Sequence, residues 1–147
     1  MQNNHLIRPA DTDGRFALVE HVLAPRELAA PVHTHVHEDE YSYVLEGRLG
    51  AQVGDDVVEA GPGELVAKPR GIPHAFWNAG DAPCRILELI SPGEFVNYFD
   101  EMEPLLAVDG PPDLAALAEL QARYALTMDF ATIGSLAERH GLAVPGA

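Results

Sequence analysis

The sequence predicts an all-β domain, either an antiparallel sandwich or a barrel, followed by a helical C-terminal extension. Up to about residue 92, short runs rich in β-branched and aromatic residues alternate with turns that contain Gly or Pro. No long helical pattern separates these runs, so the crossover helices of a parallel sheet are not expected. From residue 93 onward, apolar residues recur at helical spacing instead.

The predicted strands are short and closely spaced. Their sequences, in order, include RFALVEHVLAP, YSYVLEG, RLGAQVGDD, ELVAKP, HAFWN and CRILELI, with the turns GPG, RGIP and AGDAP between the later ones. Gly and Pro favour turns, whereas Val, Ile and aromatic residues favour extended backbone. Leu49, Ala51 and Val53 alternate with more polar neighbours, as in a strand with one buried face. These runs assign residues 1–92 to the β domain.

Helical patterns dominate residues 93–147. The apolar residues of GEFVNYFDEMEPLL that recur at i, i+3, i+4 and i+7 are Phe95, Tyr98, Phe99 and Met102. Asp113 is placed to cap a second helix over DLAALAELQARYAL. A third helix, in TIGSLAERHGL, is expected to end at Gly141. We expect the apolar faces of these helices to pack against the β domain or against a second subunit.

The composition is that of one globular domain and argues against several classes of partner. The chain has 147 residues, and its 23 acidic against 9 basic residues give a formal charge of −14. So few cations disfavour binding to nucleic acid or to an anionic membrane surface. No apolar run is long enough to span a bilayer, no secretory signal is visible, and the single Cys84 cannot form an intramolecular disulfide. We therefore expect a cytoplasmic protein.

Histidine is concentrated in one short stretch, PVHTHVHEDEY. Three of the seven histidines lie within residues 33–37, and three acidic residues follow them. In a strand, His33 and His35 project from the same face, and two imidazoles on one face form half of a metal site. His74 follows later, in GIPHAFWN. A bound cation would compensate so many buried titratable groups. A surface or hydrogen-bonded core role suffices for His5, His21 and His140.

Two ordered motifs resemble those of the cupins. The first cupin motif runs His-x-His, three or four residues, Glu, six residues, Gly, and residues His33 to Gly47 match it. The second runs Gly, five residues, Pro-x-Gly, two residues, His, three residues, Asn, and every position is present from Gly63 to Asn78. Fifteen residues separate the two motifs, as in short microbial cupins. The helical extension resembles that of single-domain, quercetin dioxygenase-like cupins.

The resemblance implies an antiparallel jelly-roll β-barrel and a set of metal ligands. The implied ligands are His33, His35, Glu40 and His74. They would hold one divalent transition metal (iron, nickel, manganese, cobalt, copper or zinc), and the ligand types do not choose among these. The residues left over, His37, Glu38 and Asp39, are predicted to lie in a solvated loop. An alternative gives His37 the role of a proton shuttle.

Strand parity adds candidates for the pocket wall. Ser42 and Val44 share the parity of Glu40, and Phe76 shares that of His74, so these three side chains are predicted to line the pocket. Phe76 would offer an apolar surface to a planar substrate or belong to the barrel core. The resemblance to dioxygenases implies that Glu40 is also the catalytic base.

Three functions are compatible with these residues. The first is a metal-dependent oxygenase, a dioxygenase-like oxidoreductase, that acts on a small enolic or aromatic compound. The second is a metal-dependent cyclase, isomerase or lyase, in which the cation polarises a carbonyl or stabilises an enolate. The third is a non-catalytic binding module for a small ligand. The resemblance favours the oxygenase, and the complete ligand set favours an enzyme. Because cupin barrels commonly pair, a homodimer is expected.

Overall fold

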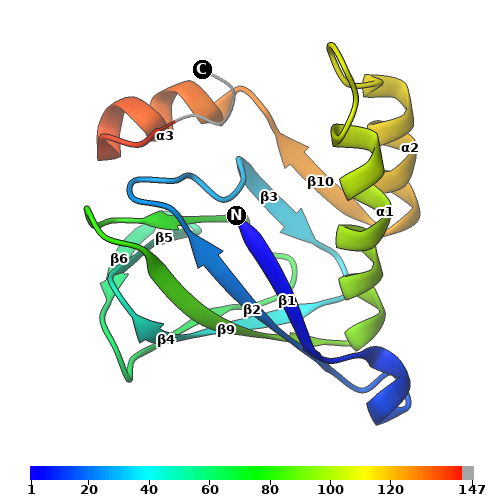
Figure 1. The fold of residues 1–147 in the computed structure, drawn as a ribbon, viewed down its shortest axis with the longest axis horizontal. Coiled ribbons are helices and arrows are strands. Elements are labelled where there is room, and N and C mark those ends of the chain that lie inside the picture. Colours follow the sequence, from blue (N-terminus) through cyan, green and yellow to red (C-terminus); the bar gives the residue numbers. More distant parts are fainter. Residues whose placement is uncertain (144–147) are drawn as a thin grey trace.

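Two facing antiparallel sheets form a barrel, and helices of the extension flank it (Figure 1). The computed structural model describes residues 1–143. The first sheet consists of β1 (Gln2–Ile7), β2 (Ala17–Leu23), β9 (Cys84–Ser91), β4 (Asp39–Glu46) and β7 (Leu65–Lys68), in that order. The second consists of β10 (Leu126–Asp129), β3 (Val32–His35), β8 (His74–Asn78), β5 (Leu49–Val53) and β6 (Asp56–Ala60). The predicted antiparallel barrel with a helical C-terminal extension is confirmed.

Alternating side chains from both sheets fill the barrel. Every second residue of β2 and of β9 is buried, as the period of a strand with one inward face requires. The apolar cluster inside the barrel includes Leu23, Val44, Leu49, Phe76 and Ile86. The same alternation determines which polar residues project into the barrel.

The extension packs against the barrel at two places. Its helices are η2 (Gly93–Val96), α1 (Asn97–Leu106), α2 (Leu114–Arg123) and α3 (Thr132–His140), and a further short helix, η1 (Pro9–Thr12), follows β1. Tyr98 of α1 and Leu120 of α2 pack with Ile90 of β9. Leu136 of α3 packs on Trp77 of β8. Figure 1 shows α1 and α2 together on one flank and α3 on another side of the barrel.

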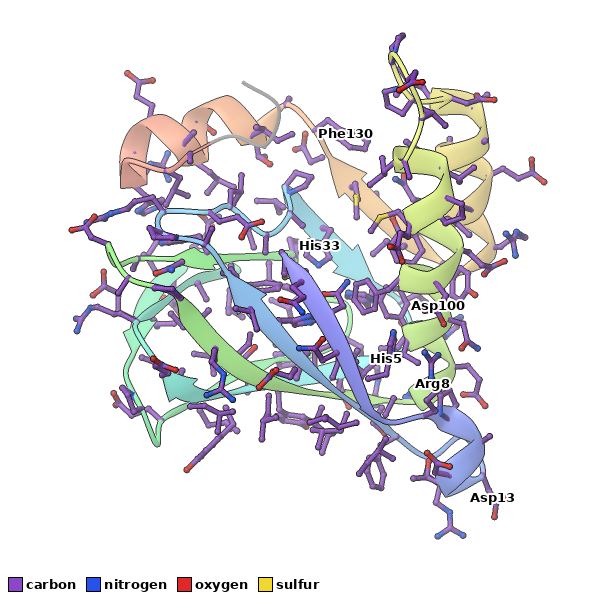
Figure 2. The ribbon with its side chains drawn as sticks, in the orientation of Figure 1. His5, Arg8, Asp13, His33, Asp100 and Phe130 are labelled. Atoms are coloured by element: carbon purple, nitrogen blue, oxygen red, sulfur yellow. The ribbon has the colours of Figure 1, made fainter. Side chains whose placement is uncertain are left out.

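Helix α1 is also tied to the N-terminal strand. Asp100 of α1 accepts a hydrogen bond from Arg8 Nη1 at 2.7 Å, and its other oxygen lies 3.2 Å from His5 Nε2. The three side chains are labelled in Figure 2 beside the lower half of α1. These contacts hold α1 next to β1, which matters because α1 forms part of a cavity wall.

The second predicted helix is shorter than expected because Tyr124 and Ala125 form a turn and Leu126 begins a strand. The Asp113 carboxylate caps α2 as predicted, accepting hydrogen bonds from two backbone N–H groups of the first turn. The helix ends at Arg123, however, and Ala125 turns the chain with a φ of 49°. The next residues form β10, which pairs antiparallel with β3. Pairing with an exposed strand edge is a tertiary interaction that local helical spacing does not encode, and here it prevails.

The extension and the barrel therefore share one sheet. The division into residues 1–92 and 93–147 remains a prediction, and residues 144–147 lie outside the described part of the chain. Within residues 1–143, no helix has the length and apolar character needed to cross a membrane.

Candidate metal centre and its cavity

Four buried polar side chains meet between the two sheets. They are His33 and His35 on β3, Glu40 on β4 and His74 on β8. Their donor atoms, one from each residue, all lie within 4.8 Å of one another. His33, labelled in Figure 2 near the centre of the molecule, is directly opposite His74 in the β3–β8 pair. Glu40 comes from the facing sheet, so the cluster exists only when the barrel closes.

Two of the three imidazoles are oriented through contacts of their Nδ1 atoms with backbone carbonyl groups. Nδ1 of His33 lies 2.8 Å from the carbonyl oxygen of Pro31, and Nδ1 of His74 lies 3.2 Å from that of Ile72. A carbonyl can only accept, so in both rings Nδ1 donates its hydrogen and Nε2 keeps a lone pair. Nε2 of His35 and Nε2 of His74 lie 2.8 and 3.3 Å from Glu40 Oε1. The Nε2 atoms are therefore the donors that this cluster presents.

The electrostatics of the cluster favour neutral imidazoles at His33 and His74, a protonated imidazole at His35 and an anionic carboxylate at Glu40. Burial, followed by repulsion from His74 and His35, lowers the pKa of His33 to about 3, and burial also lowers the pKa of His74. Burial opposes the charged forms of His35 and Glu40 too, but their mutual attraction outweighs it. The pKa of His35 is therefore raised to about 9, and that of Glu40 is held well below its usual range.

These four residues fit a divalent transition metal. His74 Nε2 is buried and has no hydrogen-bond partner among the described residues. A lone pair in that position costs free energy unless a proton or a cation occupies it. A cation would also displace the proton that His35 shares with Glu40, because metal ligands bind in their deprotonated forms. Mixed imidazole and carboxylate donors are typical of iron, nickel, manganese, cobalt, copper and zinc sites.

An apolar cavity of about 230 Å³ opens beside the cluster. His33, His35 and Glu40 contribute polar groups to its wall, and Phe76 also lines it. Much of the remaining wall comes from the extension, through Phe95, Tyr98, Phe99, Met102, Leu117, Leu126, Met128 and Phe130. Aromatic and Met side chains of this kind suit a flat apolar molecule that carries a polar group at the cluster.

Comparison with known protein families identifies the barrel. The family described as "Cupin domain" matches residues 19–90, which include all four residues of the cluster. The chain belongs to the cupin superfamily. Among curated proteins, this cupin is similar to the tetracenomycin polyketide synthase protein TcmJ of Streptomyces glaucescens, at 32% identity over 88 residues. The match covers 59% of this cupin and spans 58% of the length of TcmJ.

Solved structures show the same fold. The polyketide cyclase RemF from Streptomyces resistomycificus is 37% identical, with a TM-score of 0.53, over 61% of this cupin and 63% of RemF. A cupin-superfamily sugar phosphate isomerase from Silicibacter pomeroyi is 26% identical, with a TM-score of 0.52, over 60% of this cupin and 59% of that chain. KdgF from Halomonas sp. shares only the fold, at 16% identity and a TM-score of 0.55, over 62% and 77% of the two chains. These likenesses support the superfamily, and the resemblance to its quercetin dioxygenase-like group stays a prediction.

Two of the predicted wall residues of this cupin lie elsewhere. Val44 belongs to the apolar cluster inside the barrel, and Ser42 is fully buried and does not line the cavity. Both side chains are fully buried, as the inward strand parity predicts, but neither contributes to the cavity wall. Ser42 Oγ instead donates a hydrogen bond of 2.6 Å to Glu88 Oε2.

Glu88 belongs to a buried ion pair that the sequence analysis missed. Lys68 Nζ lies 2.8 Å from Glu88 Oε1, and both side chains are almost completely buried. Lys68 Nζ also lies 4.1 Å from the centroid of the Phe76 ring, and its charge helps to lower the pKa of Glu40. The sequence does contain a signal for this pair, because Lys68 in ELVAK and Glu88 in CRILELI are charged residues at inward positions of predicted strands.

The three residues outside the motif differ in their surroundings. His37 is exposed and does not line the cavity, and Asp39 accepts hydrogen bonds of 2.9 and 2.8 Å from the backbone N and Nη1 of Arg70. Glu38, predicted to be solvated, is buried instead, with Oε2 3.4 Å from His35 Nδ1. A bend between β3 and β4 turns Glu38 back toward the cluster, which strand parity does not foresee.

Glu38 is therefore expected to orient His35 as carbonyl groups orient the other two histidines. Replacing Glu38 with Ala should weaken metal binding by about 10- to 100-fold, the usual effect of removing a partner of a metal-bound histidine. Glu38→Gln keeps an acceptor oxygen, so its affinity for the metal should fall less than that of Glu38→Ala. Competition with a chromophoric chelator measures both affinities, and Glu46→Ala on exposed β4 surface is the control. Equal affinity in Glu38→Ala and in the unmodified protein would contradict this role.

Proposed function

We propose that this cupin is a metal-dependent enzyme for a small enolic or aromatic compound, and that its reaction is a ring closure of the polyketide type. The observation that carries the proposal is the opening of a three-histidine, one-glutamate cluster onto an apolar cavity lined by aromatic side chains. The likeness to the polyketide cyclase RemF and to TcmJ supports cyclisation over the other reactions that such a site performs.

The residues of the site have the groups that ring closure needs. A divalent cation held by the cluster would supply a Lewis acid toward a carbonyl or enolate oxygen. Glu40 uses Oε1 for its contacts with His35 and His74, which leaves Oε2 for a proton. Glu40 takes a proton from a carbon between two carbonyl groups, and that carbon forms a bond to a third carbonyl carbon of the same molecule. The proton returns to the new alkoxide oxygen, and loss of water completes the ring without an oxidant.

The cavity contributes by shaping the substrate. Phe76 from the barrel and Phe99 from α1 both line it, so a chain of alternating carbonyl groups would be held folded between apolar surfaces. Such confinement brings the reacting carbons together and excludes water, which otherwise competes for the carbonyl groups.

An oxygenase acting on the same class of compound is the second candidate. The observation that favours it is the donor set, because redox-active metals such as iron, nickel and manganese bind the same mixture of imidazole and carboxylate as zinc does. Consumption of dioxygen separates the two reactions.

Ring closure is expected to proceed under argon. Metal-free protein is reconstituted in parallel with each of the six metals and incubated with a synthetic linear polyketide ester. The appearance of an aromatic product is followed by absorbance and by mass spectrometry. Chelator-treated protein is the negative control, and the exposed His37→Ala variant should match the unmodified protein. Substrate-dependent dioxygen uptake without anaerobic product would favour the oxygenase. No conversion of either kind, with any metal, would contradict the enzyme proposal.

A further inference from the structure

His21 is a buried histidine of the cavity wall that the metal cluster does not use. It lies on β2 with 1% of its surface exposed and lines the cavity beside the cluster. Its Nδ1 lies 2.8 Å from Oδ1 of Asn3 on the neighbouring strand β1. With this amide oxygen as acceptor, Nδ1 carries the ring hydrogen, and Nε2 at the far end of the ring keeps a lone pair.

The ring of His21 is held between the barrel and the extension. It stacks against Phe76 of β8 at a centroid distance of 6.1 Å and meets the Phe99 ring of α1 edge to face at 5.6 Å. Both phenylalanines also line the cavity. A ring fixed by two aromatic neighbours and by Asn3 offers its lone pair in one direction, with little rotational freedom to lose when a ligand binds.

His21 stays neutral in this environment. Burial and then the positive charge of Lys68 lower its pKa to about 3, with smaller contributions in the same direction from His5 and the N-terminal ammonium group, and Glu40 acts in the opposite direction. At neutral pH, Nε2 is therefore a hydrogen-bond acceptor and not a donor.

We propose that His21 Nε2 accepts a hydrogen bond from a hydroxyl group of the substrate, and that the cavity thereby selects planar compounds with a phenolic or enolic hydroxyl at a second point apart from the cluster. This inference rests on the proposed function, because it specifies the substrate class of the same site. Apart from the cluster, the cavity wall is largely apolar. One fixed acceptor in such a wall determines how a ligand is oriented as well as how tightly it binds. A ligand without the hydroxyl would leave the buried lone pair unsatisfied.

The test compares naphthol with its methyl ether, which has the same ring but cannot donate a hydrogen bond. Ligand fluorescence measures the affinity of both probes for metal-free protein, so that no contact with a metal contributes. The unmodified protein should prefer naphthol by about 5- to 10-fold, the value of one net hydrogen bond. His21→Phe preserves the aromatic packing and should abolish this preference. His140→Phe, which alters a histidine stacked on Trp77 outside the cavity, should retain it.

Each outcome bears directly on the role of His21. A preference for naphthol that disappears only in His21→Phe supports it, whereas equal preferences in the unmodified protein and in His21→Phe overturn it. Equal affinity of the unmodified protein for both probes also overturns it. If His21→Phe does not fold, His21→Leu takes its place, and an unchanged preference in that variant overturns the role. Because binding is measured without metal or turnover, failure here is distinct from failure of the anaerobic ring-closure assay.

Discussion

Replacing His35 with Ala is expected to empty the metal site. His35 is buried, supplies one of four donors and lies 2.8 Å from Glu40 Oε1, so its loss removes a ligand and frees the carboxylate. Affinity should fall by more than about 100-fold, because loss of a ligand exceeds the effect of losing an outer partner. Metal content of tag-free protein, measured by mass spectrometry, should drop from near one equivalent to background.

The matched control lies two residues further along the chain. His37 is also a histidine of the PVHTHVHEDEY stretch, but it is exposed and outside the cluster. His37→Ala should therefore retain the metal content of the unmodified protein. If His37→Ala were the variant that lost its metal, the assignment of the His-x-His motif to residues 33 and 35 would be wrong.

Replacing Lys68 with Met is expected to destabilise the fold strongly. Lys68 and Glu88 form a buried ion pair at 2.8 Å, and Lys68 also compensates the charge of Glu40. Removing one partner of a buried pair leaves an uncompensated charge and costs about 3–5 kcal/mol. For a chain of this size, that corresponds to a decrease in melting temperature on the order of 10 °C, measurable by thermal unfolding of metal-free protein.

The pH dependence of Lys68→Met provides a second observable. Burial raises the pKa of Glu88, and the charge of Lys68 opposes that rise. Without Lys68, the pKa of Glu88 in the folded state should rise further above its value in the unfolded chain. The protonated form then stabilises the fold below the folded-state pKa, and this contribution is lost as pH increases. The destabilisation relative to the unmodified protein should therefore grow with pH.

Two variants control for the loss of a lysine-sized side chain. Arg48→Met breaks the exposed ion pair with Glu59 and should change the melting temperature little. The double variant Lys68→Met/Glu88→Leu removes both buried charges and should recover part of the lost stability. A Lys68→Met protein as stable as the unmodified one would show that the buried pair is dispensable.

The parts of this cupin that depend on local spacing could be predicted from the sequence. The period of alternating strands placed His33 and His35 on one face, and the spacing of the two motifs brought Glu40 and His74 into the same cluster. Strand parity also gave Phe76 as a wall residue, and Phe76 lines the cavity. Parity works here because β8 pairs with β5 without a register shift, so the side chains of β8 alternate regularly between the two faces of the sheet.

The remaining features depend on contacts between distant segments. His21 gains its place in the cavity from Asn3 on a strand that pairs with β2 and from Phe99 of a helix almost eighty residues away. Glu38 is turned inward by a bend, and β10 is a strand only because β3 offers an unpaired edge. No periodicity in a single segment encodes such contacts. The homodimer expected from the sequence remains a prediction for the same reason, since it depends on a second chain.

Anomalous X-ray diffraction from metal-loaded crystals tests the central claim most directly. Data collected on either side of the metal absorption edge should show one strong peak between β3, β4 and β8. It should lie about 2.0–2.2 Å from the Nε2 atoms of the three histidines and from an oxygen of Glu40. A peak at another group of residues, such as His5 and Asp100, or no peak in crystals of fully loaded protein, would contradict the assignment of this cluster as the metal centre.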